Sequence, residues 1–319
     1  MNIYTELSEI QSIKKPVLTI GTYDGVHLGH QKILDFLKQK AEQEKGESVV
    51  FTFYPHPRMV LFPDDHNLEL LQTIDERIDK LSKLGIDHLI VFPFTKEFSR
   101  LSAVEFVRDI LVNEINIHTL VIGYDHQFGR NREGSKHVLY ELAPIYNFNI
   151  VEIPAFLKDE IKISSTKIRN ALKKGEVQIA NKYLGENYSI KGIVVHGDKI
   201  GADIGFPTAN IQVKEDYKLI PENGVYAVKV FVNDCEFSAM LNIGNRPTIS
   251  GNGEKRIEVH IFDFNKNIYD SKIKVEFVKR IRNEKTFTNL EELKKQLTID
   301  ESKCRTILGD YSYSAPKKC

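Results

Sequence analysis

The chain has 319 residues, of which 41% are hydrophobic and 28% are charged, and its 44 Lys and Arg residues balance its 44 Asp and Glu residues. This length predicts about two domains, each able to bury a core. The charge balance argues against nucleic acid bound through a broad basic face, and no apolar run is long enough to span a bilayer. The amino end is not a signal peptide, and three widely spaced cysteines form no disulfide framework or metal clip. We therefore expect a cytoplasmic protein without a membrane or nucleic-acid partner.

Strand-like and helix-like patterns alternate over the first 185 or so residues. Helical spacing follows the first strand, and two capping boxes, Thr73 to Glu76 and Ser102 to Glu105, open further helices. This alternation predicts a parallel sheet covered on both faces, with a ligand at the carboxyl ends of its strands. The predicted strands are 17–21, 48–53, 88–92, 118–122 and 149–153.

The pattern changes near residue 185, after two predicted helices at 166–174 and 177–183. From there the period becomes two, and short strands broken by Gly, Asn and Pro predict a small antiparallel barrel. A last helix follows, for which Thr288 and Glu291 form the predicted capping box, and residues 311–319 have no periodicity and form a tail. The clearest strands of this half are 225–232, 256–262 and 273–277.

The strongest motif, GTYDGVHLGHQ, occupies residues 21–31, where the first strand leads into the first helix. The helix amino end offers free N–H groups and a positive dipole to phosphate, and His27 and His30 can point at the same phosphate. The segment has neither a Walker nor a GxGxxG pattern but the HxGH form of a nucleotidyl-transfer site. A glycine-rich turn with incidental histidines and a zinc site are weaker alternatives. The glycines that let a ligand approach the backbone are Gly21, Gly25 and Gly29.

Three further segments fit the same site. The loop 51–58 follows the second strand and holds Arg58 toward the cleft, and the loop 123–134 suits a mobile substrate loop. The segment 163–170 opens a helix with hydroxyls and places Arg169 in its first turn, where a guanidinium adds a fork for phosphate. Taken alone, the first segment is better explained as a proline-rich turn, and the second is equally consistent with a solvated turn. Hydroxyls at a helix start, as in the third, are usually plain caps.

The segment 192–210, GIVVHGDKIGADIGFPTAN, carries the chemistry of the second half. Its glycine-rich loop can wrap phosphates with backbone N–H groups. Thr208 and Asn210 offer oxygen ligands of the kind that Mg²⁺ prefers. On a later strand, Glu258 lies on the polar face and is the candidate for proton transfer. A plain glycine-rich hairpin and a solvated glutamate remain the alternatives.

These motifs together resemble the prokaryotic bifunctional riboflavin kinase/FAD synthetase (FMN adenylyltransferase) family over about residues 15–310. They occur in the family's order: GTYDGVHLGHQ, FYPHP, GYDHQFG and ISSTKIR, then GFPTAN, GVY, NIGNRPT and EVHIFDFNKNIY. The resemblance implies an α/β Rossmann-like nucleotidyltransferase domain followed by an antiparallel β-barrel, riboflavin kinase-like domain with a C-terminal helix. The implied domains are 1–185 for FMN adenylyltransferase and 186–310 for riboflavin kinase, with the tail at 311–319.

The resemblance implies two reactions, phosphorylation of riboflavin to FMN and adenylylation of FMN to FAD with release of pyrophosphate. ATP is the co-substrate of both, FMN and FAD are product and substrate, and Mg²⁺ is the cofactor, with Thr208 and Asn210 as its ligands. His27 and His30 polarise the ATP phosphates, and Glu258 accepts the proton of the riboflavin 5′-hydroxyl. The implied nucleotide-binding residues are Gly21, Asp24, Gly25, Gly29, Arg58, Ser165, Thr166, Arg169, Gly197, Lys199, Gly201 and Gly205. The implied flavin-binding residues are Phe62, Asp125 and Phe128.

The chain departs from the family's usual pattern at several positions. Tyr23 and His126 stand where the family usually has Phe, and Ile200 and Ala202 are neutral where related kinases usually carry arginines. The alternative function left open is therefore an adenylyltransferase whose kinase half is inactive or impaired. A flavin-binding regulatory protein without turnover is the alternative from another class. The expected partners are the small molecules riboflavin, FMN and ATP, and weak homo-oligomerisation is compatible with the sequence.

Overall fold

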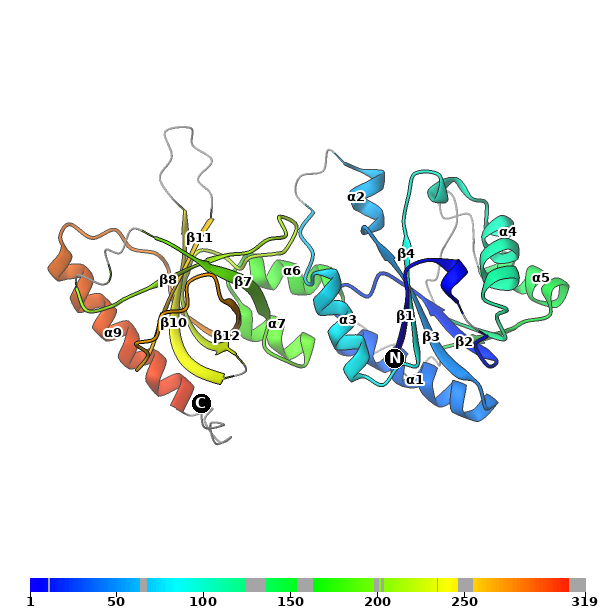
Figure 1. The fold of residues 1–319 in the computed structure, drawn as a ribbon, viewed down its shortest axis with the longest axis horizontal. Coiled ribbons are helices and arrows are strands. Elements are labelled where there is room, and N and C mark those ends of the chain that lie inside the picture. The colour runs from blue at the N-terminus through cyan, green and yellow to red at the C-terminus, as the bar shows by residue number, and fades with distance from the viewer. Residues whose placement is uncertain are drawn as a thin grey trace. The chain divides into compact units, whose positions relative to one another are not determined.

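The computed structural model describes residues 1–10, 12–63, 68–123, 136–153, 163–197, 201, 204–233, 235–245 and 255–309. The chain divides into two compact units, Met1–Ser164 and Ser165–Cys319 (Figure 1). Each unit has a fold of its own. Across the described residues, no helix combines the length and the apolar character that a membrane crossing requires.

The first unit is built on a parallel sheet with the strand order β1-β4-β3-β2-β5-β6. The strand order reverses at β2, which lies between β3 and β5, and ligands of such sheets bind at the carboxyl ends of the strands at this position. The predicted parallel α/β fold is confirmed. The strands are β1 (Asn2–Tyr4), β2 (Pro16–Ile20), β3 (Glu47–Tyr54), β4 (His88–Pro93), β5 (Thr119–Ile122) and β6 (Asn149–Glu152).

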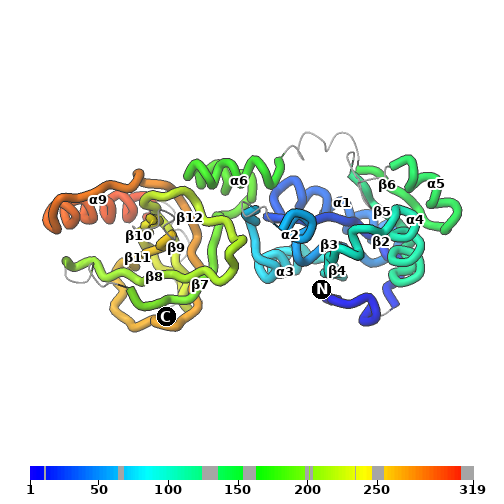
Figure 2. Tube along the Cα trace, turned by 90° about the horizontal axis from the view of Figure 1, so that it is seen from above, coloured from blue at the N-terminus to red at the C-terminus, as the bar shows by residue number. Residues whose placement is uncertain are grey.

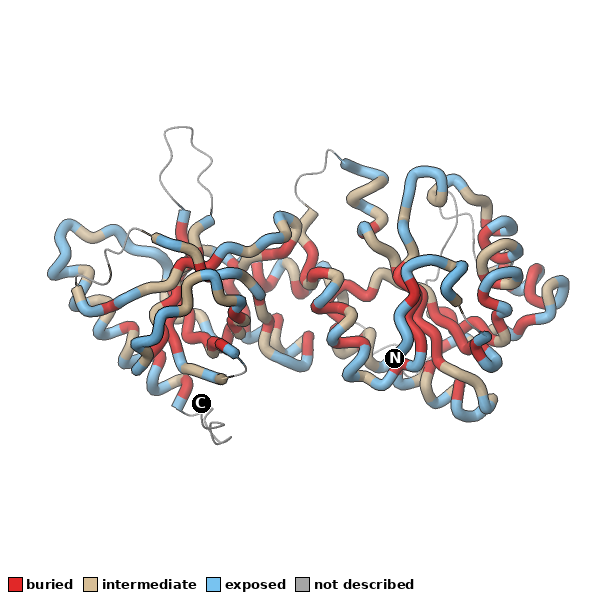
Figure 3. Tube along the Cα trace, in the orientation of Figure 1, coloured by how far each residue is buried: buried red, intermediate tan, exposed pale blue. Residues whose placement is uncertain are grey.

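Helices cover both faces of this sheet because successive strand residues point to opposite sides. Leu18 and Phe51 face one hydrophobic cluster with Phe106, whereas Val17 and Val50 face a second cluster that α1 and α3 close. Figure 3 shows the four central strands, β2 to β5, as buried over most of their length. The helices are α1 (Leu28–Glu44), α2 (Pro57–Leu61), α3 (Ile74–Lys83), α4 (Ala103–Glu105), which continues as the π-helix η3 (Phe106–Glu114), and α5 (Lys136–Tyr146), with 3-10 turns η1 (Leu7–Glu9) and η2 (Phe98–Arg100).

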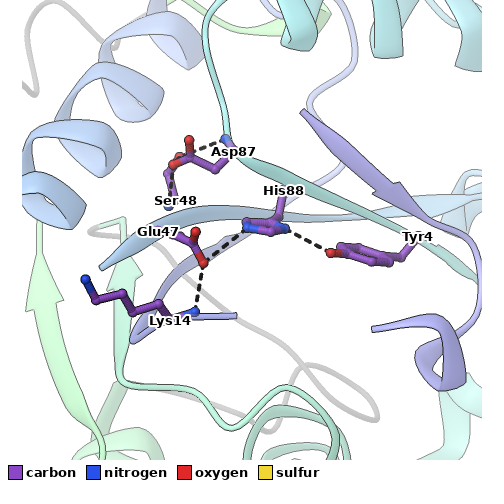
Figure 4. A network of polar contacts seen from close by, with 6 residues as sticks. All are labelled: Tyr4, Lys14, Glu47, Ser48, Asp87 and His88. Carbon is purple, nitrogen blue, oxygen red and sulfur yellow. Dashed lines mark hydrogen bonds and ion pairs between the residues drawn. The ribbon is translucent and has the colours of Figure 1, made fainter. Parts of the chain in front are cut away.

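A polar network joins Tyr4 of β1 to the amino ends of β3 and β4 (Figure 4). The buried imidazole of His88 lies 3.1 Å from the Tyr4 hydroxyl and 3.4 Å from a carboxylate oxygen of Glu47. Ser48 and Asp87 hydrogen-bond each other next to it, with the serine hydroxyl 2.7 Å from the carboxylate. Strand β1 has only three residues, and the side-chain contact between Tyr4 and His88 therefore adds to its backbone pairing with β4.

The second unit is a closed antiparallel barrel with the strand order β10-β11-β8-β7-β12-β9, which confirms the predicted barrel. Figure 2 shows α9 alongside the barrel, and buried Phe206, Ala227 and Cys304 belong to the core cluster between them. The unit begins with two helices. Its elements are α6 (Ser165–Lys173), α7 (Val177–Leu184), β7 (Ser189–Val195), β8 (Ala209–Gln212), β9 (Gly224–Val232), β10 (Cys235–Asn245), β11 (Lys255–Ile261), β12 (Lys272–Arg282) and α9 (Leu290–Gly309).

Both capping boxes in the first unit are confirmed, since Thr73 and Ser102 each exchange hydrogen bonds with the glutamate three residues on. The predicted box at Thr288 and Glu291 is wrong. Asn289 Oδ1 accepts the hydrogen bond of the Glu292 N–H at 2.9 Å, and the Glu292 carboxylate accepts from Thr288. The helix therefore begins one residue later than predicted, because Asn is preferred over Thr as an N-cap and the Glu292 carboxylate accepts the hydrogen bonds of Thr288 instead.

The cysteines also differ from expectation, because Cys235 is disulfide-bonded whereas Cys304 is a buried free thiol. Spacing along the chain does not determine which residues the fold brings together. Burial raises the pKa of the Cys304 thiol to about 12, with Asp300 and Glu301 acting in the same direction. Cys304 is therefore a packing residue at neutral pH.

Candidate active sites

The turn from β2 into α1 brings His27 and His30 together in the first unit. His27 is the N-cap of α1, and its Nδ1 accepts the hydrogen bond of the His30 backbone N–H at 3.2 Å. The two imidazole rings are stacked, with centroids 3.7 Å apart. This arrangement places both histidines at the amino end of a helix, where backbone N–H groups and the helix dipole favour phosphate.

The imidazole of His30 is kept neutral by its surroundings. Burial holds the pKa of His30 well below its ordinary value of 6.5. The charges of His27, Lys80 and Arg77 lower it further. His30 Nδ1 is buried and has no hydrogen-bond partner among the residues that the structure describes. A buried polar atom of this kind is normally satisfied, so the ring is prepared for a hydrogen bond with a ligand.

Tyr23 packs beneath this pair. Its backbone φ is +48°, its ring meets the His30 ring edge-on at 5.1 Å between centroids, and its hydroxyl lies 3.0 Å from Thr19 Oγ1. A Cβ on Gly21 would lie 2.9 Å from the Tyr23 ring, so only glycine fits at that position. Burial raises the pKa of the Tyr23 phenol well above its ordinary value, so the phenol stays protonated. Tyr23 therefore supports His30 through its ring.

A cavity of about 240 Å³ opens beside His30. Its walls come from the end of β2 at Ile20, from Gly123 after β5 and from Ile153 after β6. The cavity thus lies at the carboxyl ends of the strands on one side of the reversal in strand order, where the sequence predicts the ligand. Gly25, with φ of +89°, turns the chain between the cavity wall and the helix.

Two buried cations from α3 hold the loop that carries the motif. Arg77, only 1% exposed, donates from Nη1 to the Thr22 carbonyl oxygen at 2.6 Å and to Thr52 Oγ1 at 3.1 Å. Lys80 donates from Nζ to the Gly25 carbonyl oxygen at 3.3 Å. These residues were not among the predicted site residues. They fix the backbone of the loop and add positive charge behind the histidines.

Asp24 completes this clamp from the other direction. Its carboxylate, 2% exposed, accepts backbone N–H hydrogen bonds from Leu71 at 2.9 Å and from Gln72 at 3.2 Å. In this structure Asp24 thus holds the segment that leads into α3. A direct contact of Asp24 with the nucleotide stays a prediction.

The remaining predicted residues of the adenylyltransferase site lie on several elements. Arg58 is in α2 and Phe62 is its C-cap, with 59% of Phe62 exposed. The structure places Ser165, Thr166 and Arg169 on α6, in the second unit. Because α6 begins one residue earlier than predicted, Arg169 is its fifth residue and lies just beyond the first turn. Gly29 is buried in the first turn of α1. Asp125 and Phe128, and Lys199 of the kinase half, lie outside the described residues.

The pairing of two barrel strands assembles the second site. β11 and β8 are antiparallel, with Glu258 directly opposite Asn210. Arg256 lies two residues before Glu258, and its Nε is 2.8 Å from Glu258 Oε1 and 2.7 Å from Asn210 Oδ1. The predicted proton acceptor and the predicted metal ligand are therefore brought to one point. Arg256 was missed, since a cation next to an acidic strand residue has no distinctive pattern in a sequence.

Two cavities meet at Thr208. One, of about 340 Å³, is lined by polar Glu258 and His260 and by apolar Phe206 and Leu293. The other, of about 410 Å³, is lined by Pro207, Thr208 and the segment 264–269, where the Tyr269 ring stacks on His196 at 3.9 Å between centroids. Thr208 lines both, so a group held at Thr208 can be shared by ligands in the two cavities.

The predicted glycines of the barrel loop have steric reasons to be glycine. A Cβ on Gly197 would lie 1.9 Å from Asn210 Nδ2, and a Cβ on Gly201 would lie 2.3 Å from the Phe206 carbonyl oxygen. Gly205 has φ of +90°, which favours glycine. At Gly197 the loop therefore lies close to the side-chain amide of Asn210, and at Gly201 it lies close to the backbone of Phe206.

The oxygen atoms of this site suit Mg²⁺. Thr208, Asn210 and Glu258 offer a hydroxyl, an amide oxygen and a carboxylate in adjoining positions. Mg²⁺ is usually held by few protein oxygens and completes its shell with water and substrate phosphates. Within the part of the chain that the structure describes, no three His, Cys, Asp or Glu side chains converge on a point. The described residues thus offer a few oxygen atoms of the kind that Mg²⁺ uses.

Comparisons with known proteins divide the chain in the same way. A family model described as FAD synthetase matches residues 9–167, and one described as riboflavin kinase matches residues 184–308. A bifunctional riboflavin kinase/FMN adenylyltransferase from Bacillus subtilis is 40% identical over 293 residues, which cover 90% of each chain. The protein of the same description from Escherichia coli strain K12 is 36% identical over 294 residues, which cover 92% of this chain and 93% of that protein.

A solved structure has the same fold. It is described as a macrolide-efflux protein from Streptococcus pneumoniae, and it superposes with a TM-score of 0.85 and 32% sequence identity. The match covers 95% of this chain and 98% of that one. The description belongs to that protein, and the likeness confirms here the order of a parallel α/β fold, a barrel and a final helix.

Proposed function

The chain belongs to the bifunctional riboflavin kinase/FMN adenylyltransferase family, and we propose that each of its two cavity regions carries one of the two reactions. The protein phosphorylates riboflavin to FMN with ATP, and it adenylylates FMN to FAD. This assignment of one reaction to each region rests on two separate polar centres, one at His30 and one at Glu258, each beside its own cavity. We propose residues 1–185 as the adenylyltransferase domain and residues 186–310 as the kinase domain.

In adenylyl transfer, the FMN phosphate attacks the α-phosphorus of ATP, a new P–O bond forms, and the bond to the leaving pyrophosphate breaks. The FMN phosphate is already anionic near neutral pH, so no protein base is required. His27 and His30 donate hydrogen bonds to the ATP phosphates as charge develops on the leaving group. The amino end of α1 adds its dipole, and the loop fixed by Arg77 and Lys80 holds these groups in place.

In the kinase reaction, Glu258 accepts the proton of the riboflavin 5′-hydroxyl while that oxygen bonds to the γ-phosphorus and ADP leaves. The mostly apolar cavity that contains Glu258, Phe206 and Leu293 suits the flavin ring. The neighbouring cavity, with the stacked Tyr269 and His196, suits the nucleotide. Thr208 lies between them, where the phosphoryl group passes from one ligand to the other.

Mg²⁺ is the proposed cofactor, with Thr208 and Asn210 as its protein ligands. When bound, it neutralises charge on the transferring phosphates. The glycine loop, including Gly197, Gly201, Gly205 and Lys199, is proposed to contact the nucleotide phosphates. Phe62, Asp125 and Phe128 are proposed to contact the flavin of FMN. We also propose that the protein acts in the cytoplasm, while weak self-association stays a prediction.

The test is chromatography of the products formed over time from riboflavin, ATP and Mg²⁺. FMN should accumulate first and FAD should follow, with ADP and pyrophosphate released in turn. A second reaction, started with FMN in place of riboflavin, isolates the adenylyltransferase. If FAD formed only when FMN was supplied, the kinase half would be inactive, and the neutral residues Ile200 and Ala202 would be the first candidates for the cause.

A further inference from the structure

Arg256 lies where the proposed base and the proposed metal ligand of the kinase meet. Its Nε contacts Glu258 Oε1 at 2.8 Å and Asn210 Oδ1 at 2.7 Å. A Cβ on Gly197 would lie 3.1 Å from Arg256 Nη2, so the same guanidinium borders the glycine turn. The side chains of Arg256 and Glu258 are 29% and 28% exposed, and both line the cavity that contains Thr208.

Stability alone is a weak explanation for this ion pair. β11 is already held by backbone pairing to β8 on one side and to β10 on the other. Partly exposed ion pairs contribute only about 0–1 kcal/mol to folding. Arg256 instead constrains the side chains of Glu258 and Asn210, which face each other across β11 and β8 and which the proposed reaction uses.

We propose that Arg256 is a positioning residue of the kinase reaction, an inference that rests on the roles proposed above for Glu258 and Asn210. Arg256 holds Oε1 of Glu258, so that Oε2 is presented to the flavin hydroxyl. The same N–H uses one lone pair of the Asn210 amide oxygen and leaves the other for the metal. Charge-assisted hydrogen bonds and the rigid plane of a guanidinium suit this task.

The consequence is a loss of rate rather than of binding. Without Arg256, the carboxylate samples more rotamers, and fewer of them place an oxygen against the hydroxyl. The substrates keep their own contacts in the two cavities. Removal of Arg256 should therefore lower the kcat of FMN formation while changing the KM values little.

The experiment compares R256Q, R256K, E258Q and the double variant R256Q/E258Q in the full-length protein. K255Q is the matched control, because Lys255 is the neighbouring residue of β11 and does not line this cavity. Its Nζ donates to the Ile220 carbonyl oxygen instead. We expect R256Q to lower the kcat of FMN formation about 30-fold, with KM values for ATP and riboflavin within about threefold. R256K should recover part of the rate, and K255Q should behave as the wild type.

The double variant decides whether Arg256 acts through Glu258. If it does, R256Q/E258Q should be no slower than E258Q, because the positioned group is already absent. A circular dichroism spectrum and an unfolding midpoint equal to those of the wild type report that the barrel of each variant is folded, and FAD formation from supplied FMN within about twofold of wild type reports that the first unit is unaffected. Effects that multiply in the double variant, or a raised KM for ATP at unchanged kcat, would overturn the positioning role. An E258Q variant with full kinase activity would instead overturn the proposed base.

Discussion

The two candidate sites are held in place by different means. In the first unit, α3 supports the histidine pair indirectly: Arg77 and Lys80 donate to backbone carbonyls, and Asp24 accepts from backbone N–H groups. In the barrel, the corresponding support is a side-chain contact, in which Arg256 joins Glu258 to Asn210. The first support is almost fully buried, whereas the second is partly exposed to solvent.

This difference follows from where each site lies in its fold. A site on the loop after a parallel strand must have its backbone fixed by distant segments, because the loop has no ladder partners of its own. A site on paired barrel strands receives its backbone geometry from the ladder, so only the side chains remain to be ordered. The first site should therefore be sensitive to changes in α3, and the second to changes of single side chains within β8 and β11.

The largest expected effects come from separating the two reactions. His30→Ala should lower FAD formation from FMN by about 10²-fold or more, since the hydrogen bond to the phosphates is lost where charge develops. FMN formation should be unchanged. Glu258→Ala should do the reverse. The measurement is the initial rate of each reaction with its own substrate.

The same pair of variants can contradict the comparison. A single substitution that abolished both reactions in a folded protein would mean that the sites share a centre. Circular dichroism spectra and unfolding midpoints equal to those of the wild type are the control for folding. The partner reaction in each variant serves as an internal control of concentration.

Much of both sites could be predicted from the sequence because their residues lie in short motifs. The HxGH segment places His27 and His30 on one helix turn, and strand alternation places Glu258 on the polar face of β11, as the structure has them. The fold followed from the change of hydrophobic period near residue 185. Local sequence patterns were sufficient to place the site residues that lie close together in the chain.

The supports could not be predicted, because they join residues far apart in the chain. Arg77 and Thr22 are separated by 55 residues, and Arg256 and Asn210 by 46. In the sequence, Arg77 and Lys80 read as ordinary polar residues beside the apolar stripe of α3. Only the packing of α3 against the motif loop shows that both are buried. The capping residue Asn289 was missed for a smaller reason, since the adjacent Thr288 is also a common capping residue and is followed three residues later by a Glu.

The next effect tests the backbone clamp. Arg77→Met should lower the free energy of unfolding by about 3 kcal/mol, because Thr22 and Thr52 lose a buried donor. We also expect FAD formation to fall about tenfold while FMN formation stays near wild type, since a displaced loop misplaces the histidines. Lys83→Met on the exposed end of the same helix is the matched control.

Hydrogen exchange distinguishes the clamp from general destabilisation. In Arg77→Met, the amides of residues 22–25 should exchange faster than those of β3, whose ladder is intact. Uniform acceleration across the first unit, with unchanged FAD formation after correction for the folded fraction, would show that Arg77 contributes stability alone. The contrast between the two sites would then rest on Lys80 and Asp24.

A smaller effect is a pH dependence that should be confined to the first unit. The folded-state pKa of His30 lies below its ordinary value, so the unfolded chain binds more protons than the folded protein between those two values. The free energy of unfolding should therefore rise with pH through that window. The contribution of His30 should reach its full value above about pH 6.5 and should be lost as the solution is acidified.

The measurement for this effect is the urea midpoint of the first unit at about pH 7.5 and about pH 5.5 for wild type and His30→Gln. The midpoint should fall less on acidification in the variant, because the neutral amide does not titrate. Equal falls in the two proteins would remove His30 as the source of the dependence. Amide exchange in the barrel, followed in the same samples, gives the comparison region.

The smallest expected effect concerns Tyr23, whose ring and hydroxyl can be tested apart. Tyr23→Phe removes only the hydrogen bond with Thr19, which should cost about 1 kcal/mol or less and leave FAD formation within about twofold of wild type. Tyr23→Leu also removes the ring that meets His30, and FAD formation should fall further, by about fivefold. If Tyr23→Phe alone lowered FAD formation as much as Tyr23→Leu, the Tyr23–Thr19 pair would position His30 as Arg256 is proposed to position Glu258. The first site would then depend, like the second, on a hydrogen bond between side chains.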